Sequence, residues 1–160
     1  MKLKTIYCIF SAIIIAVCMA SCSGDCYVPT KARMGVAFMD STTLKPYTIN
    51  GLTVQGVGSD SILYNKVNTS VIYLPLHDNA EQTDFKITIA STVEGEQDKE
   101  YIMHIDHTPR PQLISPECGC VMFQTVISAD VSPVMSDYTI EIYNAEVKNI
   151  ENDIHLKIFF

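Results

Sequence analysis

Three residues near the middle of the chain have side chains that can bind a metal ion: His104, Asp106 and His107. Imidazole nitrogens and carboxylate oxygens within a short span are typical zinc ligands. However, they belong to the alternating run 100–107, which we interpret as a β-strand, and successive side chains of a strand point to opposite faces. His107 then points away from His104 and Asp106. We therefore expect a polar strand face here, with no metal and no other cofactor.

Other catalytic arrangements lack their partner residues. His77 and His155 lie far from each other in the sequence, and we interpret both as surface or strand-end residues. No serine stands in a Gly-x-Ser-x-Gly motif, and no glycine-rich phosphate loop occurs. The many aspartates and glutamates fall in predicted turns, where acids are usually solvated. No catalytic residue is predicted, and the chain is not expected to be an enzyme.

The cysteine at position 22 has a clearer chemical role. Lys2 and Lys4 precede the uncharged, largely apolar run 5–21, which is the pattern of a signal peptide. The strongly apolar part is shorter than the roughly 20 residues that span a bilayer. Met19-Ala20-Ser21-Cys22 resembles the lipobox of bacterial lipoproteins, in which small residues precede the cysteine that receives a diacylglycerol. We expect cleavage before Cys22 and a stable anchor of two or three acyl chains. The alternative is an ordinary signal peptide.

This processing predicts a location in the bacterial cell envelope, on a membrane. Ser23-Gly24-Asp25 lacks the acidic run that resembles a surface-export signal, so we expect the outer membrane with the protein facing the periplasm. The cell exterior is the alternative. The formal charge of −7 includes Lys2 and Lys4, and their removal leaves about −9. An acidic chain without a basic stripe repels nucleic acid, which is therefore excluded as a partner.

Three further cysteines remain in the mature chain: Cys26, Cys118 and Cys120. Export takes them to an oxidising space, where thiols pair, which argues against a thiolate metal site. Three cysteines cannot all pair internally, so we expect one disulfide and one odd thiol. We expect Cys26, which lies in the tether, to be one of the two bonded cysteines. A disulfide from Cys26 would close a loop of about 90 residues. Cys118 and Cys120 compete as its partner.

The elements that position these residues are predicted to be strands. From Arg33 onward, runs rich in Val, Ile, Tyr, Phe and Thr are separated by Gly, Pro, Asn, Asp and Ser. We predict strands over 34–39, 52–57, 70–76, 85–91, 100–106, 121–129, 138–143 and 154–160. Eight such strands suit one all-β domain, an antiparallel β-sandwich. The predicted organisation is a signal peptide over 1–21, a lipidated N-terminus and tether over 22–32, and the sandwich over 33–160.

The residues between these strands carry turn signals. Glu94-Gly95-Glu96 predicts a hairpin, and Asn50-Gly51 predicts a further turn. Pro109 and Pro111 are expected to break strand pairing. Within the run 100–106, alternation predicts that its apolar face, formed by Tyr101, Met103 and Ile105, packs into the core.

Two loop serines are candidate modification sites. Asp40-Ser41-Thr42 and Asp60-Ser61-Ile62 each resemble the short sequon for O-linked glycans on exported proteins of Bacteroidota. Both lie in predicted loops, where a glycan at Ser41 or Ser61 would leave the core undisturbed.

Several stretches together resemble a family of Bacteroidota lipoproteins of unknown function. These are the lipobox, the runs 52–58 and 60–65, Ile114-Ser115-Pro116-Glu117-Cys118-Gly119 and the closing Lys157-Ile158-Phe159-Phe160. The resemblance spans nearly the whole mature chain and implies no activity. It includes a cysteine a few residues beyond the lipidated one, which matches Cys26, and it implies a Cys26–Cys118 disulfide. Cys120 departs from the pattern.

These observations favour a non-enzymatic envelope lipoprotein that binds or supports another envelope component through a sheet face or edge. That component is expected to be a protein or a glycan. The alternative is a carbohydrate-binding or glycan-handling accessory protein, for which Tyr138 and Tyr143 are the candidate aromatics. The absence of Trp argues against the alternative.

Overall fold

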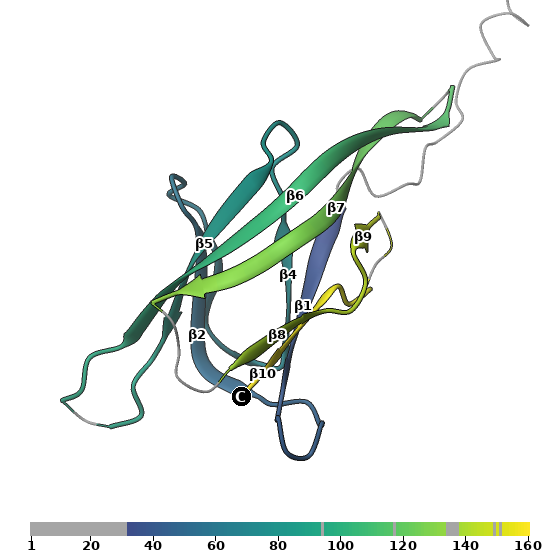
Figure 1. The fold of residues 1–160 in the computed structure, drawn as a ribbon. Coiled ribbons are helices and arrows are strands. Elements are labelled where there is room, and N and C mark those ends of the chain that lie inside the picture. The colour runs from purple at the N-terminus through teal and green to yellow at the C-terminus, as the bar shows by residue number, and fades with distance from the viewer. Residues whose placement is uncertain (1–31, 94, 117, 134–137, 149, 151) are drawn as a thin grey trace, which may run out of the picture.

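The computed structural model describes residues 32–160 except 94, 117, 134–137, 149 and 151. Within this part every regular element is a strand, and no helix long and apolar enough to cross a membrane occurs. The strands are β1 (Arg33–Met39), β2 (Ile49–Gly56), β3 (Ile62–Thr69), β4 (Val71–Pro75), β5 (Gln82–Ile89), β6 (Lys99–Ser115), β7 (Gly119–Ser132), β8 (Thr139–Ile142), β9 (Glu146–Val147) and β10 (Leu156–Phe159) (Figure 1).

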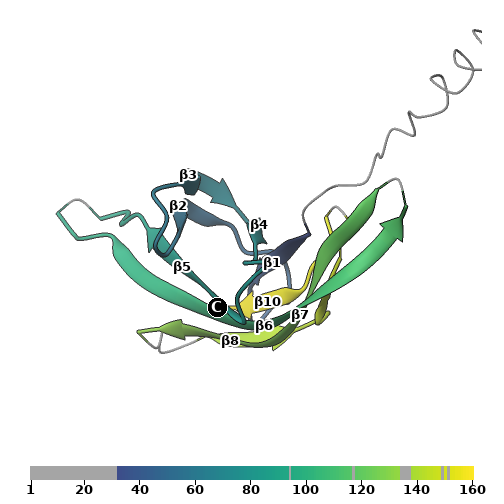
Figure 2. The same ribbon diagram turned by 90° about the horizontal axis from the view of Figure 1, so that it is seen from above.

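The strands form two sheets that pack face to face, which confirms the predicted β-sandwich. One sheet has the order β4-β1-β10-β8 and the other has the order β3-β2-β5-β6-β7-β9. Seen from above, β3 and β4 lie together on one side, where the chain passes from one sheet to the other (Figure 2). All pairs are antiparallel except β1 and β10, which run parallel. The antiparallel prediction is wrong for this pair. Nearly the whole domain lies between β1 and β10 in the sequence, so no hairpin joins them and fixes their relative direction.

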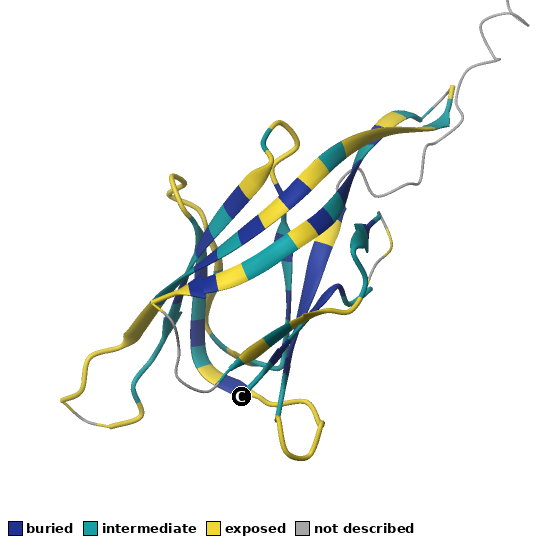
Figure 3. Cartoon of the chain, viewed as in Figure 1, coloured by how far each residue is buried: buried dark blue, intermediate teal, exposed yellow. Residues whose placement is uncertain are grey.

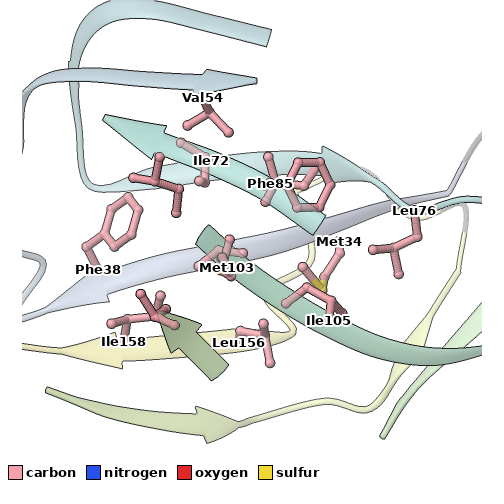
Figure 4. Packing of buried hydrophobic residues seen from close by; sticks show 14 of the residues in the cluster. Met34, Phe38, Val54, Ile72, Leu76, Phe85, Met103, Ile105, Leu156 and Ile158 are labelled. Atoms are coloured by element: carbon pink, nitrogen blue, oxygen red, sulfur yellow. The ribbon is translucent and has the colours of Figure 1, made fainter. Parts of the chain in front are cut away.

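The core lies between the sheets and follows the alternation of the strands. Burial and exposure alternate along β5, β6 and β7 (Figure 3). Met103 and Ile105 are fully buried, and Tyr101 packs partly buried against the same cluster, so the predicted face of this strand is confirmed. Met103 and Ile105 lie toward side chains of the facing sheet, among them Met34 and Leu156 (Figure 4). The interior of the sandwich is therefore filled by apolar side chains from both layers.

The prolines of β6 do not break the strand, contrary to the sequence prediction. Pro109 pairs with Gln124 and Pro111 pairs with Met122 of β7. The partner on the other side, β5, ends at the pair of Gln82 with Asp106. Residues two apart direct their nitrogens toward the same edge, and here that edge has no neighbouring strand. Both prolines are therefore tolerated, and the β6–β7 hairpin extends beyond the sandwich as a two-stranded arm (Figure 1).

Asn50-Gly51 also differs from its prediction, because it lies inside β2 and not in a turn. The pairing of β2 with β3 shifts register after Ile49, which marks a bulge. Gly51 has a φ of 66°, and a Cβ at this position would lie 2.6 Å from the Cβ of Ala90. Glycine is thus required here by both its backbone angle and the close approach of the neighbouring chain. The predicted hairpin between β5 and β6 is present, with Gly95 at a φ of 90°.

Candidate functional site

A hollow lies at one end of the sandwich, beside Phe160 and the β5–β6 hairpin. Its volume is about 470 Å³, and it is partly open to solvent. This size lies within the range of small-molecule sites, roughly 300–1,000 Å³. The hollow is bounded by the segment that enters β2, by the residues that leave β5 and by the start of β6. Its walls therefore come from segments far apart in the sequence.

Three aromatic rings form a stack from the core to this hollow. Phe160 lies between Phe38 and Tyr47, with ring centroids 6.1 Å and 5.7 Å away. Phe38 is buried, whereas Tyr47 is 45% exposed. Backbone hydrogen bonds hold the stack in place, since Tyr47 N–H donates to the Phe38 carbonyl and Phe160 N–H donates to that of Met39. Tyr47 therefore presents a ring to the hollow that is supported from behind.

Polar residues complete the described lining: Thr48, Asn50, Ser91, Thr92, Glu96 and Lys99. The Ser91 hydroxyl lies 3.4 Å from Glu96 Oε2, and it can also donate to the Val93 carbonyl at 3.3 Å. Neither Glu96 nor Lys99 forms an ion pair with another described residue. The lining thus offers hydrogen-bond donors and acceptors and one charge of each sign. Among the described lining residues there is one carboxylate and neither histidine nor cysteine.

Behind the aromatic rings, a second space of about 20 Å³ lies between the sheets. It shares Ile49, Ile89, Tyr101 and Phe160 with the hollow, and it has no polar surface. A volume of this size accommodates about one water-sized group. The hollow therefore ends at an apolar floor and does not continue as a channel into the core.

A smaller hollow of about 270 Å³ lies between β3 and β4, beside Arg33 and Leu63. The hydroxyl of Tyr64 is already hydrogen-bonded in the structure. Tyr73 N–H donates to the hydroxyl oxygen of Tyr64 at 2.8 Å, and that hydroxyl lies 3.4 Å from the Tyr73 carbonyl. These contacts bind the Tyr64 hydroxyl to the backbone at the outer edge of β4.

The whole outer edge of β4 is blocked in this way. Arg33, Gly35 and Ala37 of β1 stand opposite Pro75, Tyr73 and Val71, whose nitrogens face outward. Val71 N–H donates to Thr69 Oγ1 at 3.1 Å, Tyr73 N–H is taken by Tyr64, and proline has no N–H. A strand from another chain would therefore find no free donor along β4. The predicted binding of another envelope component through a sheet edge is therefore disfavoured at β4.

The residues first considered as metal ligands lie on two faces of β6. His104 Nδ1 lies 2.9 Å from Asp84 Oδ1, and Asp106 accepts a hydrogen bond from the Ser128 hydroxyl at 2.6 Å. His107 is buried on the opposite face. Within the described ranges, no group of three or more His, Cys, Asp or Glu side chains is arranged to hold a metal ion.

His107 forms a buried polar network that sequence reasoning missed. Its Nδ1 lies 2.9 Å from Gln124 Oε1, and its Nε2 lies 2.8 Å from Thr83 Oγ1. Thr83 also accepts the N–H of His77, and the Gln124 amide reaches the His77 carbonyl at 3.4 Å. Burial lowers the pKa of His107, and His77 lowers it further, whereas the Gln124 hydrogen bond and the carboxylates of Asp106 and Asp78 oppose this. The network holds a neutral imidazole and ties the β4–β5 loop to β6 and β7.

His155 directly precedes β10, as expected of a strand-end residue, but it is fully buried, so the prediction of a surface position is wrong. Its Nδ1 accepts the N–H of Gly35 at 2.9 Å, which places the ring hydrogen on Nε2. Nε2 has no hydrogen-bond partner in the described part of the chain, and Asp153 Oδ2 lies 3.8 Å away. Burial lowers the pKa of His155 and exceeds the opposing effect of Asp153. His77, by contrast, is exposed.

The cysteines lie partly outside the region that the structure covers. Cys118 and Cys120 lie at the tip of the β6–β7 arm. Cys118 is half-buried and disulfide-bonded, and Cys120 is an exposed free thiol. Cys22 and Cys26 lie outside the described residues, as does the signal peptide. Lipidation of Cys22 and the pairing of Cys26 with Cys118 therefore stay predictions.

The remaining sequence candidates do not converge on one site. Tyr138 is partly buried, and its hydroxyl lies 3.3 Å from the Val131 carbonyl. Tyr143 lies at the other end of β8 and is 61% exposed, with Lys157 Nζ 3.5 Å from its ring centroid. Ser41 and Ser61 are exposed, one in a turn and one just before β3. Whether either serine carries a glycan stays a prediction.

The aromatic residues of the hollow gave no comparable sequence signal. Tyr47 follows Pro46 in a segment interpreted as a loop, and Phe160 lay at the end of a predicted strand. The one usable signal was Asn50-Gly51, whose glycine allows the close approach of Ala90 at the wall of the hollow.

Comparison with known proteins identifies a family without an assigned activity. A family model described as a family of unknown function, DUF6452, matches residues 51–160. No curated protein and no solved structure matches the chain. The matched region includes most of the sandwich, from β2 to β10, and two walls of the hollow. The chain therefore belongs to the DUF6452 family.

Proposed function

We propose that this protein is a lipid-anchored, non-enzymatic binding module of the bacterial cell envelope, and that its ligand occupies the hollow beside Tyr47. The hollow carries the proposal, because it combines a supported aromatic ring with donors and acceptors in a volume typical of ligand sites. The blocked edge of β4 and the prolines of β6 disfavour strand addition at these two edges. The anchor would be the lipid on Cys22, on an outer membrane and facing the periplasm.

Binding is favoured over catalysis by the chemistry of the lining. A nucleophilic serine is usually activated by a histidine, and none occurs among the described lining residues, where the Ser91 hydroxyl lies 3.4 Å from the Glu96 carboxylate. Hydrolysis of glycosidic bonds generally uses a pair of carboxylates, and Glu96 is the single carboxylate among the lining residues that the structure describes. The described hollow thus supplies contacts for a ligand without a recognisable set of reacting groups.

The binding site is tested with the exported Cys22→Ser chain, purified from the soluble fraction. Three classes of compound are added separately at millimolar concentration: neutral oligosaccharides, palmitate and short unstructured peptides. We expect at least one class to shift the backbone NMR signals of Tyr47, Asn50 and Lys99. The signal of Glu141 on β8 serves as a distant reference. If none of the three classes shifts the signals of the hollow, the proposed site is refuted.

The anchor is tested in the same strain. Wild-type chain should incorporate labelled palmitate and remain with membranes, and Cys22→Ser should abolish both. A free thiol at Cys22 in wild-type protein, or an uncleaved Met1, contradicts the anchor. Protease treatment of intact cells then separates periplasmic from surface exposure, since a periplasmic domain is protected.

The disulfide is tested by peptide mapping without reduction. We expect one peptide pair joining Cys26 to Cys118, with Cys120 recovered as a free thiol. A Cys26 peptide joined to Cys120, or a free Cys26, contradicts this assignment.

A further inference from the structure

We infer that the hollow accepts a neutral sugar, with one ring of that sugar lying against Tyr47. This inference rests on the proposed function and specifies the chemical class of its ligand. It also replaces Tyr138 and Tyr143, the aromatic candidates from the sequence, with Tyr47.

The first argument is the position of the Tyr47 ring. The ring packs against Phe160 and is 45% exposed toward solvent. Phe160 in turn packs on buried Phe38, and the backbone bonds of Tyr47 and Phe160 fix the base of the stack. An aromatic ring that is already held in place loses little conformational freedom when a ligand binds. It therefore offers a flat apolar platform to the apolar C–H face of a sugar ring.

The second argument is the balance of polar groups around this platform. Sugar hydroxyls both donate and accept hydrogen bonds, so they need partners of both kinds. Lys99 donates, Glu96 accepts, and the amide of Asn50 does both. An anionic ligand would be repelled by Glu96, and a cationic ligand would be repelled by Lys99. The pair of opposite charges favours a ligand with no net charge.

The third argument is the shape of the hollow, which excludes the main apolar competitor. The apolar space behind the rings measures about 20 Å³, enough for about one water-sized group. An acyl chain would therefore have to separate the sheets or lie along a half-polar surface. The mouth of about 470 Å³ requires no such opening. A polar ring in the mouth fits without any change in the core.

The inference is tested by the affinity of three variants for oligosaccharides of glucose, mannose, galactose and N-acetylglucosamine, each of two to six rings. The exported Cys22→Ser chain is used, and binding is followed by NMR. We expect at least one oligosaccharide to bind, and Tyr47→Ala to weaken it by about 10-fold or more. Tyr47→Phe keeps the platform and should bind within about twofold of wild type. Tyr143→Ala removes a tyrosine elsewhere that is even more exposed, and it should leave affinity unchanged.

The outcomes separate the two proposals. If no oligosaccharide binds while palmitate or a peptide shifts the Tyr47 signal, the sugar inference is overturned and the binding site stands. If an oligosaccharide binds but Tyr47→Ala and Tyr143→Ala weaken it equally, the platform is overturned. Melting temperatures of all variants are measured first. If Tyr47→Ala does not fold, the affinity of Tyr47→Phe tests the platform instead, because this variant should bind within about twofold of wild type.

Discussion

Polar residues have different roles at the two ends of β5. Near its start, Thr83 is buried and joins His107 and Gln124 in a network that connects every polar atom to a partner. Beyond its last residue, the chain enters the wall of the hollow, where Ser91 and Glu96 remain accessible to solvent. Polar groups at the first end form hydrogen bonds with one another inside the fold. Polar groups at the second end are exposed to solvent and available to a ligand.

The difference indicates where stability and binding are located. A buried polar group without a partner costs about 1–3 kcal/mol, so a closed network is maintained by the fold itself. Polar groups beside an open hollow bear no such penalty, because water satisfies them until a ligand replaces it. Side chains at the network end should therefore be sensitive to substitution, and those at the hollow end should tolerate it.

The largest effect is expected at the core between the two ends. Ile105→Asp places a charge among buried apolar side chains, and we expect a loss of at least about 4 kcal/mol or complete unfolding. The matched control is Ile127→Asp, because Ile127 on β7 is 62% exposed, and its stability should stay within about 0.5 kcal/mol of wild type. Urea denaturation measures both. Equal stability of the two variants would contradict the burial of Ile105.

A second effect is expected when pH falls. Burial lowers the pKa of both His107 and His155, so below about pH 6.5 the folded chain holds fewer protons than the unfolded chain. Stability should be constant above that pH and decline below it, by up to about 1.4 kcal/mol per pH unit for each histidine. Above pH 6.5 both states are neutral at these residues.

Urea denaturation at pH 7.5, 6.5 and 5.5 measures this decline before most carboxylates titrate. NMR titration of the imidazole protons should show His107 and His155 remaining neutral below pH 6.5. Constant stability between pH 7.5 and 5.5 would contradict the lowered pKa of both groups.

These residues also show how far the sequence could predict the structure. The burial of Met103 and Ile105 followed from strict alternation, which depends only on neighbours along the strand. The burial of His155 did not, because it requires Gly35 of β1 to donate to its ring, and that contact spans 120 residues. Pro109 was misread because a proline signal says nothing about which edge of the strand lacks a neighbour.

The candidate site was even less accessible to sequence reasoning. Tyr47, Glu96 and Phe160 belong to three separate segments, and each alone resembles an ordinary loop or strand-end residue. Sheet packing brings them together, and the parallel β1–β10 pair places Phe160 beside Phe38. No periodicity predicts a meeting of segments that depends on the order of strands in two sheets.

A third, smaller effect is expected at the network end. Thr83→Val removes the hydroxyl that bonds His107 Nε2 and accepts the His77 N–H, and leaves both without that partner. We expect a loss of about 1–3 kcal/mol. Thr88→Val is the matched control, since Thr88 lies on the same strand and makes no side-chain hydrogen bond among the described residues. If both variants have equal stability by urea denaturation, the network does not stabilise the fold.

The smallest effect on stability is expected from Tyr47→Ala at the hollow. The substitution removes a half-exposed ring whose hydroxyl has no hydrogen bond within the described chain, and Phe160 remains packed on Phe38. The lost contact with Phe160 should cost about 1 kcal/mol or less, below the cost of Thr83→Val. Urea denaturation of the two variants under identical conditions makes the comparison. If Tyr47→Ala proves the more costly, the ring is a structural support of the aromatic stack, and the hollow end is not the tolerant end of the sandwich.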